Sequence, residues 1–198
     1  MAKQPELRRA YEAKDTAEIM RILRKQSSEA EEFARNVELD LDVNPKKLAS
    51  ITDANLAGIF PFLKKPFKGK FHFYIDGEDV VPLGERGSYP FAYAEWLIDN
   101  FWGYSEERIY GKNNGEMQSH VLAYECGDYS PDIFLFREGD SELVIPTFWK
   151  NPRRVSVQAF KQAVRGFSNK ALSLLEQNPN LKGSHRVKSL KKGLSGLR

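Results

Sequence analysis

The chain has 198 residues, of which 41% are hydrophobic, and a formal net charge of +3. This length favours one domain, and the 12% aromatic content is enough for a packed core. The single cysteine excludes an internal disulfide and a multi-cysteine zinc site, while no apolar run reaches the roughly 18 residues of a membrane-spanning helix. Because the first residues also lack a secretory signal, we expect a cytoplasmic protein without a membrane partner.

Residues 1–60 are expected to form an N-terminal segment of short helices. The spacing of Asp15 with Glu18 predicts one helix start, and that of Ser28 with Glu31 predicts a second, whose apolar stripe runs to Val37. A third helix is predicted from 45 to about 59, with proline in its first turn.

Residues 61–178 are expected to form an α+β core that opens with a hairpin. Apolar residues alternate with polar ones over 71–75, which predicts a half-buried strand. Asp76-Gly77 is a hairpin-turn signal, and the return strand is predicted from Val80. A helix is then predicted from Pro90 to about Phe101.

The second half of the core is predicted to contain three more strands and the longest helix. The strands are expected over 120–126, 133–137 and 142–148, and the last two are expected to be antiparallel because their connection is short. Apolar spacing predicts a long amphipathic helix over 157–177, capped by Ser156. Short helices, a mostly antiparallel sheet with an inserted helix, and this final helix together indicate the α+β class.

The last segment, residues 179–198, contains six basic residues, no acid and no aromatic residue. Such a composition offers little apolar surface to bury. We therefore expect a basic, disordered tail that becomes ordered only on a partner.

Charge is sorted along the chain. Residues 71–145 carry fifteen acids and four basic residues, whereas residues 146–198 carry twelve basic residues and one acid, Glu176. This asymmetry indicates either a charged partner or the neutralisation of one part of the protein by another. Both interpretations stay open from sequence, together with a merely solvated basic face and with an acidic protein, in place of nucleic acid, as the partner of the basic region.

The basic C-terminal region is the first candidate site. Cations that can gather along a phosphate backbone release its counterions, so this region predicts nucleic-acid binding, to DNA or RNA. Its candidate residues are Lys150, Arg153, Arg154, Lys161, Arg165, Lys182, Arg186, Lys188, Lys191 and Lys192.

A second candidate lies on the strand of the predicted hairpin. Lys68, Lys70, His72 and Tyr74 share one face of that strand by period-two alternation. Cations interleaved with aromatic rings can hold phosphates and stack bases. An ordinary exposed strand face is the simpler interpretation.

The acidic middle segment suggests a protein-interaction module of the inhibitor, immunity or antitoxin kind. Glu138, Asp140 and Glu142 cluster at a predicted turn and can meet a basic partner, since complementary charge speeds association. Trp96 and Tyr93 fall outside the apolar face of their helix, so an interface anchor is expected there.

The segment Ser130–Phe136 followed by Glu142 resembles the PD-(D/E)xK nuclease superfamily, which places a metal-binding acid after proline and an acid-x-lysine on the next strand. The resemblance implies that Asp132 and Glu142 bind magnesium for nucleic-acid cleavage. The helix carboxylate Glu95 is a candidate third ligand, because magnesium takes hard oxygen ligands. The lysine of the family motif is absent, because Leu143 and Val144 follow Glu142. The leading hypothesis is therefore a non-enzymatic nucleic-acid-associated protein without a cofactor, and magnesium belongs to the nuclease alternative alone.

Overall fold

The structure is a computed structural model of the whole chain, and the described residues are 6, 9–10, 13, 15–30, 33–53, 67–80, 90–102, 112–113, 116–117, 121–124, 133–138, 141–145 and 152–197.

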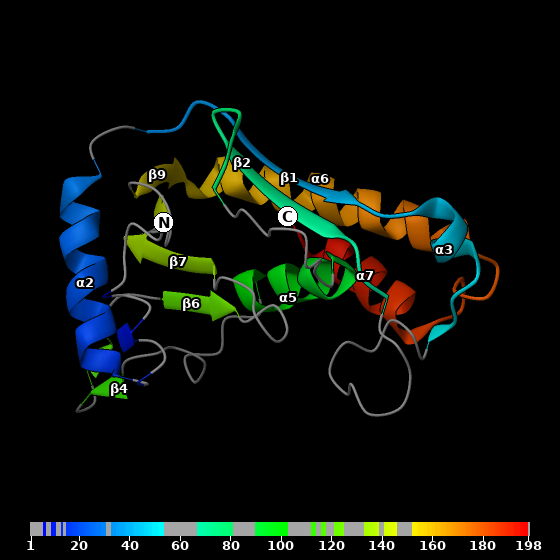
Figure 1. Cartoon of the computed structure of the whole chain (residues 1–198), viewed down its shortest axis with the longest axis horizontal. Helices are drawn as coiled ribbons and strands as arrows, with labels where there is room; N and C mark the ends of the chain where they lie inside the picture. Colours follow the sequence, from blue (N-terminus) through cyan, green and yellow to red (C-terminus); the bar gives the residue numbers. More distant parts are fainter. Residues whose placement is uncertain are drawn as a thin grey trace.

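Helices and antiparallel sheets together confirm the α+β class (Figure 1). The helices are α2 (Thr16–Glu29), α3 (Pro45–Ala49), α5 (Pro90–Trp102), α6 (Val157–Glu176) and α7 (His185–Gly196). The strands are β1 (Val37–Asp42), β2 (Lys70–Ile75), β3 (Glu78–Asp79), β4 (Lys112–Asn113), β5 (Glu116–Met117), β6 (Val121–Tyr124), β7 (Ile133–Glu138), β8 (Glu142–Ile145) and β9 (Arg153–Ser156). Within the described residues they form three antiparallel sheets in the orders β1-β2-β3, β4-β5 and β6-β7-β8-β9.

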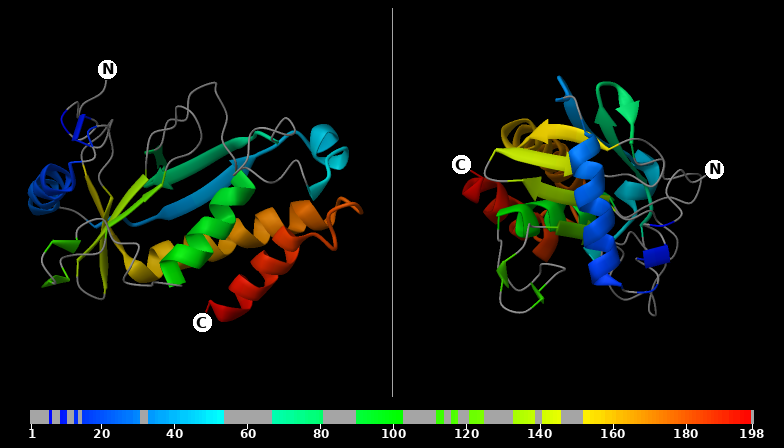
Figure 2. Two further views of the ribbon diagram at one scale, coloured as in Figure 1. Left: turned by 90° about the horizontal axis from the view of Figure 1, so that it is seen from below. Right: turned by 90° about the vertical axis from the view of Figure 1, so that its left-hand side faces the viewer.

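The main core lies between the β1-β2-β3 sheet and the helices α5, α6 and α7, which gather on one side of that sheet (Figure 2). The buried face of β2 supplies Phe71 and Phe73, whose rings meet Phe167 at 5.2 Å and Phe160 at 5.8 Å between centroids. Tyr93 of α5 stacks on Phe71 at 4.3 Å. Such aromatic pairs add to the stabilisation from buried area.

Several sequence predictions are confirmed because they rest on local patterns. The predicted strand over 71–75 is β2, with its apolar residues on the buried face. Asp76 and Gly77 both have positive φ, 51° and 79°, as a tight hairpin turn requires. The return strand β3 begins slightly earlier than expected, at Glu78. Ser156 caps α6, since its hydroxyl accepts a hydrogen bond from the backbone N–H of Ala159.

The helix predicted to start at Ser28 is wrong. Helix α2 continues through Ser28 to Glu29, and the stretch from Val37 to Asp42 is strand β1. Apolar residues at 37, 39 and 41 alternate with acids, and β1 pairs with β2 so that Leu39 lies opposite Phe73. The helix predicted from residue 45 is α3 and spans five residues, with Ser50 as its C-cap.

The expectation that residues 179–198 form a disordered tail is also wrong, because most of this segment folds as α7. Ser184 caps the helix by accepting a hydrogen bond from the N–H of Val187 at 3.2 Å. Val187, Leu190 and Leu197 are buried against the same core as α5 and α6. The composition of this segment predicted disorder because it contains few apolar residues. Those of α7 all lie on one face of the helix, where they are enough to pack against the core.

The prediction that Tyr93 is an interface anchor is wrong, because its side chain is buried in the core and cannot contact an external partner. The buried core contains residues from Leu39 to Leu197, so the three segments predicted from sequence (1–60, 61–178 and 179–198) all contribute to it.

Candidate nucleic-acid interface

The two oppositely charged blocks of the chain are joined by ion pairs within the protein. Arg153 Nη2 lies 2.9 Å from Glu78 Oε2, and Arg186 Nη1 lies 2.9 Å from Glu95 Oε2. Arg154 pairs with Glu142 across the β8–β9 ladder. Part of the basic segment therefore neutralises the acidic segment of the same molecule.

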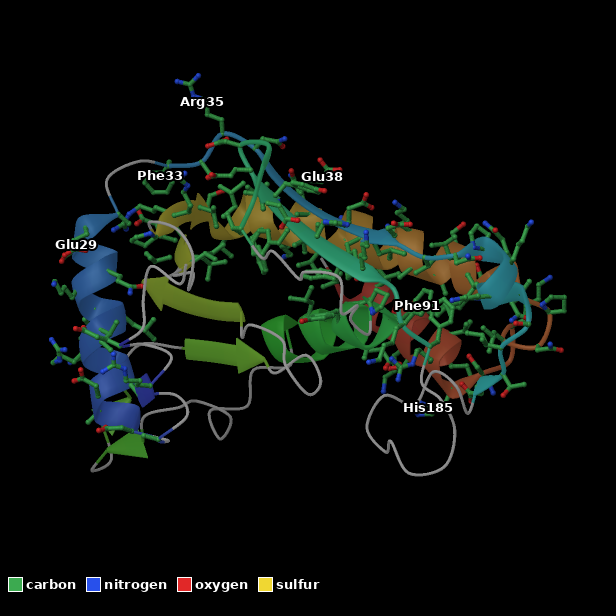
Figure 3. All side chains as sticks on the ribbon, in the orientation of Figure 1. Glu29, Phe33, Arg35, Glu38, Phe91 and His185 are labelled. Carbon is green, nitrogen blue, oxygen red and sulfur yellow. The ribbon has the colours of Figure 1, made fainter. Side chains whose placement is uncertain are left out.

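Arg154 of β9 contacts both β8 and the segment that follows α2. Besides its contact with Glu142, its Nε donates a hydrogen bond to the carbonyl oxygen of Ala30 at 3.3 Å. Its guanidinium lies 5.9 Å from the ring centroid of the exposed Phe33, which is labelled in Figure 3. The backbone N–H of Ala34 donates to the carbonyl oxygen of Arg154 at 2.8 Å. These contacts attach the segment after α2 to β9, so phosphate binding would have to compete with them.

Arg186 is likewise part of the fold. It lies in the first turn of α7, is buried, and reaches Glu95 in the middle of α5. The distance between Arg186 Nη1 and Glu95 Oε2 is that of an ion pair, although the hydrogens on Nη1 do not have hydrogen-bond geometry. Because both side chains are largely removed from water, the pair fixes α7 against α5 and leaves little of Arg186 for a ligand.

Two lysines form pairs nearer the surface. Lys170 of α6 contacts Asp40 of β1, and Lys191 of α7 lies 2.6 Å from Glu176 at the end of α6. Pairs of this exposure contribute little to stability and exchange readily with solvent.

Four cations of the basic C-terminal region are exposed and lie outside the ion pairs described above: Arg165 on α6, Lys182 in the connection, and Lys188 and Lys192 on α7. Among the described residues, none of these four has an ion-pair partner. Lys161 lies one turn before Arg165 and is partly buried. Lys150 lies outside the described residues.

Polar residues that sequence reasoning missed lie on the same side of α6 as Arg165. Gln158, Gln162 and Asn169 are exposed on the side of α6 opposite its buried Phe160 and Val164. Amide groups of this kind contact phosphate and sugar oxygens in nucleic-acid complexes. Their helical spacing from the apolar residues was a signal already present in the sequence.

The strand face of Lys68, Lys70, His72 and Tyr74 meets acids that the sequence analysis did not place there. In the β1–β2 register, Asp42 lies opposite Lys70, Asp40 opposite His72 and Glu38 opposite Tyr74.

On β3, Asp79 Oδ2 lies 2.9 Å from His72 Nδ1, and the His72 and Tyr74 rings are stacked at 5.5 Å. Partial burial, followed by the carboxylates of Asp79, Asp40 and Glu38, raises the pKa of the Tyr74 phenol. Three carboxylates therefore act on the Tyr74 ring, and their negative charge disfavours a phosphate at that ring.

The residues assigned to the other two hypotheses are only partly described. Asp132 and Asp140 lie outside the described residues, and the side chains of Trp96 and Glu138 are not described although α5 and β7 contain them. Glu95 and Glu142, the described carboxylates of the nuclease hypothesis, each pair with an arginine. No group of three or more His, Cys, Asp or Glu residues in the described part of the chain could hold a metal ion.

None of the described helices is both long and apolar enough to cross a bilayer. Comparison of the chain with protein-family models, with curated proteins and with solved structures finds no match.

Proposed function

We propose that this protein is a non-enzymatic, cytosolic, nucleic-acid-associated protein that holds the phosphate backbone through the exposed cations of α6, α7 and their connection. One observation carries the proposal. After the internal ion pairs are assigned, Arg165, Lys182, Lys188 and Lys192 are still exposed, and the only acid of residues 157–197, Glu176, is paired with Lys191.

The proposed contact set is narrower than the set expected from sequence. Arg154 and Arg186 bind acids of their own chain in the more buried pairs and serve the fold, and Arg153 is paired with Glu78 nearer the surface. Three of the remaining cations lie on helices held by a buried core, and Lys182 lies in the connection between those helices, so binding requires little ordering of backbone. Pre-ordering of this kind lowers the entropic cost of association.

The magnitude follows from counterion release. Four phosphate contacts predict a slope of log K against log salt of about −3.6, and hence a loss of about 150-fold in affinity between about 50 and 200 mM salt. Fluorescence anisotropy with a labelled nucleic acid measures both quantities.

A matched pair of variants tests the location of the site. Lys188→Gln with Lys192→Gln removes two cations one turn apart on α7 and is expected to make the slope shallower by about 1.8. Arg21→Gln with Lys25→Gln removes two exposed cations with the same spacing on α2, which lies at the other end of the molecule (Figure 1), and should leave the slope unchanged.

Two results would overturn the proposal. Wild-type protein that binds no nucleic acid at low salt has no phosphate site. An equal effect of the α2 and α7 variants would mean that bulk charge, and not this surface, governs binding.

A further inference from the structure

The proposed surface lacks the exposed Phe, Tyr and Trp side chains on which single-strand-binding proteins stack bases. Residues 157–197, all of which the structure describes, contain two aromatic rings of the Phe, Tyr and Trp kind, Phe160 and Phe167, and both are buried. His185, labelled in Figure 3 at the start of α7, presents a lone exposed imidazole. Proteins that bind single strands gain about 1–3 kcal/mol per base by stacking bases on exposed rings.

The groups that the surface does expose suit a phosphate backbone. Arg165 shares the exposed side of α6 with the amides of Gln162 and Asn169, and α7 exposes Lys188 and Lys192. Charged and amide donors reach phosphate and sugar oxygens, which position a protein on nucleic acid and carry no sequence information.

The helix fixes the spacing at which the lysine side chains are attached. Lys188 and Lys192 are one helical turn apart on the side of α7 opposite the buried Val187 and Leu190. Residues four apart on a helix have Cβ atoms about 5–6 Å apart, whereas each strand of a duplex places a phosphate about every 3.4 Å along its axis. A duplex strand, whose phosphates are closely and regularly spaced, can therefore contact both lysines at once.

Resting on the proposed function, we infer that the ligand is double-stranded nucleic acid, held through its phosphate backbone without readout of the bases. A duplex presents two strands of phosphates and releases more counterions per contact than a single strand. It also hides its base faces, so it loses nothing on a surface without exposed aromatic rings.

The test compares duplex DNA, duplex RNA and single-stranded DNA of equal length, each labelled, across a salt series. We expect either or both duplexes to bind more tightly than the single strand. For four contacts the duplex DNA slope should be steeper than the single-strand slope by about 0.8. Two duplexes of unrelated sequence should differ in affinity by less than about threefold, because backbone contacts do not read bases.

Three outcomes would overturn the inference while leaving the proposed function standing. The first is single-stranded DNA that binds as tightly as the tighter-binding duplex and loses affinity in the Lys188→Gln, Lys192→Gln variant. The second is a strong preference between the two duplex sequences. The third is a His185→Ala variant that loses single-strand affinity alone, which would show that this surface stacks bases. Absence of binding to every probe would instead refute the proposed function itself.

Discussion

The ion pair between Arg186 and Glu95 separates the role of the basic segment in folding from its proposed role in binding. The Glu95→Gln variant removes the negative charge at nearly constant shape and leaves the guanidinium without its counter-charge. The Arg186 side chain is 10% exposed and that of Glu95 is 19% exposed. Breaking a buried pair from one side costs about 3–5 kcal/mol, and the residual exposure places this pair near about 3 kcal/mol.

Urea and thermal unfolding measure this cost. For a chain of this size, about 3 kcal/mol corresponds to a decrease of about 6–12 °C in Tm. The urea midpoint should fall while the m-value stays constant, because the unfolded state is the same. Lys191→Gln is the control. It breaks the exposed pair with Glu176, whose side chains are 55% and 38% exposed, and should change stability by less than about 1 kcal/mol.

Nucleic-acid binding by folded Glu95→Gln protein completes the experiment. We expect the salt slope of the wild type, since Arg186 stays buried. A loss of stability below about 1 kcal/mol would refute the assigned energetics of the buried pair. A steeper salt slope would show that Arg186, once released from Glu95, contacts phosphate, which contradicts its assignment to the fold.

Three further predictions concern the helices and the β2 surface. Gly193→Ala should destabilise the fold by about 1–3 kcal/mol, because the new Cβ would lie 2.3 Å from Cγ2 of Ile98. The Cβ of Gly166→Ala meets nothing within 4 Å, so this variant should stabilise α6 by about 0.8 kcal/mol. Urea unfolding compares the stability of the two variants. Asn178→Ala should cost about 2–4 kcal/mol in the same assay, since its buried amide donates to two carbonyl oxygens at 2.8 and 3.0 Å. Tyr74 should ionise at higher pH in the folded protein than in the unfolded chain, so its contribution to stability is present below the unfolded pKa and lost as pH rises through the folded pKa. Ultraviolet titration of wild type minus Tyr74→Phe measures this, and a difference curve at the ordinary tyrosine pKa would contradict it.

The elements that sequence reasoning placed correctly are those whose signals are local. Helix α6 carries its own N-cap at Ser156 and a regular apolar stripe, and the β2 hairpin carries Asp76-Gly77. Neither depends on a distant partner for its identity, since caps, turn residues and periodicity act within a few positions.

Strand β1 and helix α7 were missed for the opposite reason. The apolar residues from Ala30 to Val37 fit a helical stripe that competes with the strand alternation of residues 37–42, and pairing with β2, about thirty residues later, decides for the strand. The apolar residues of α7 are few, and they stabilise the helix because α5 and α6 provide a surface on which to bury them.

The sequence by itself determined the α+β class, the longest helix and the separation of charge along the chain. Only the tertiary structure decided which charges meet. It pairs Arg153, Arg154 and Arg186 with acids of the same molecule and leaves Lys188 and Lys192 exposed on α7. The physical reason is that charge is counted along the chain, whereas ion pairing depends on distances in space that packing sets.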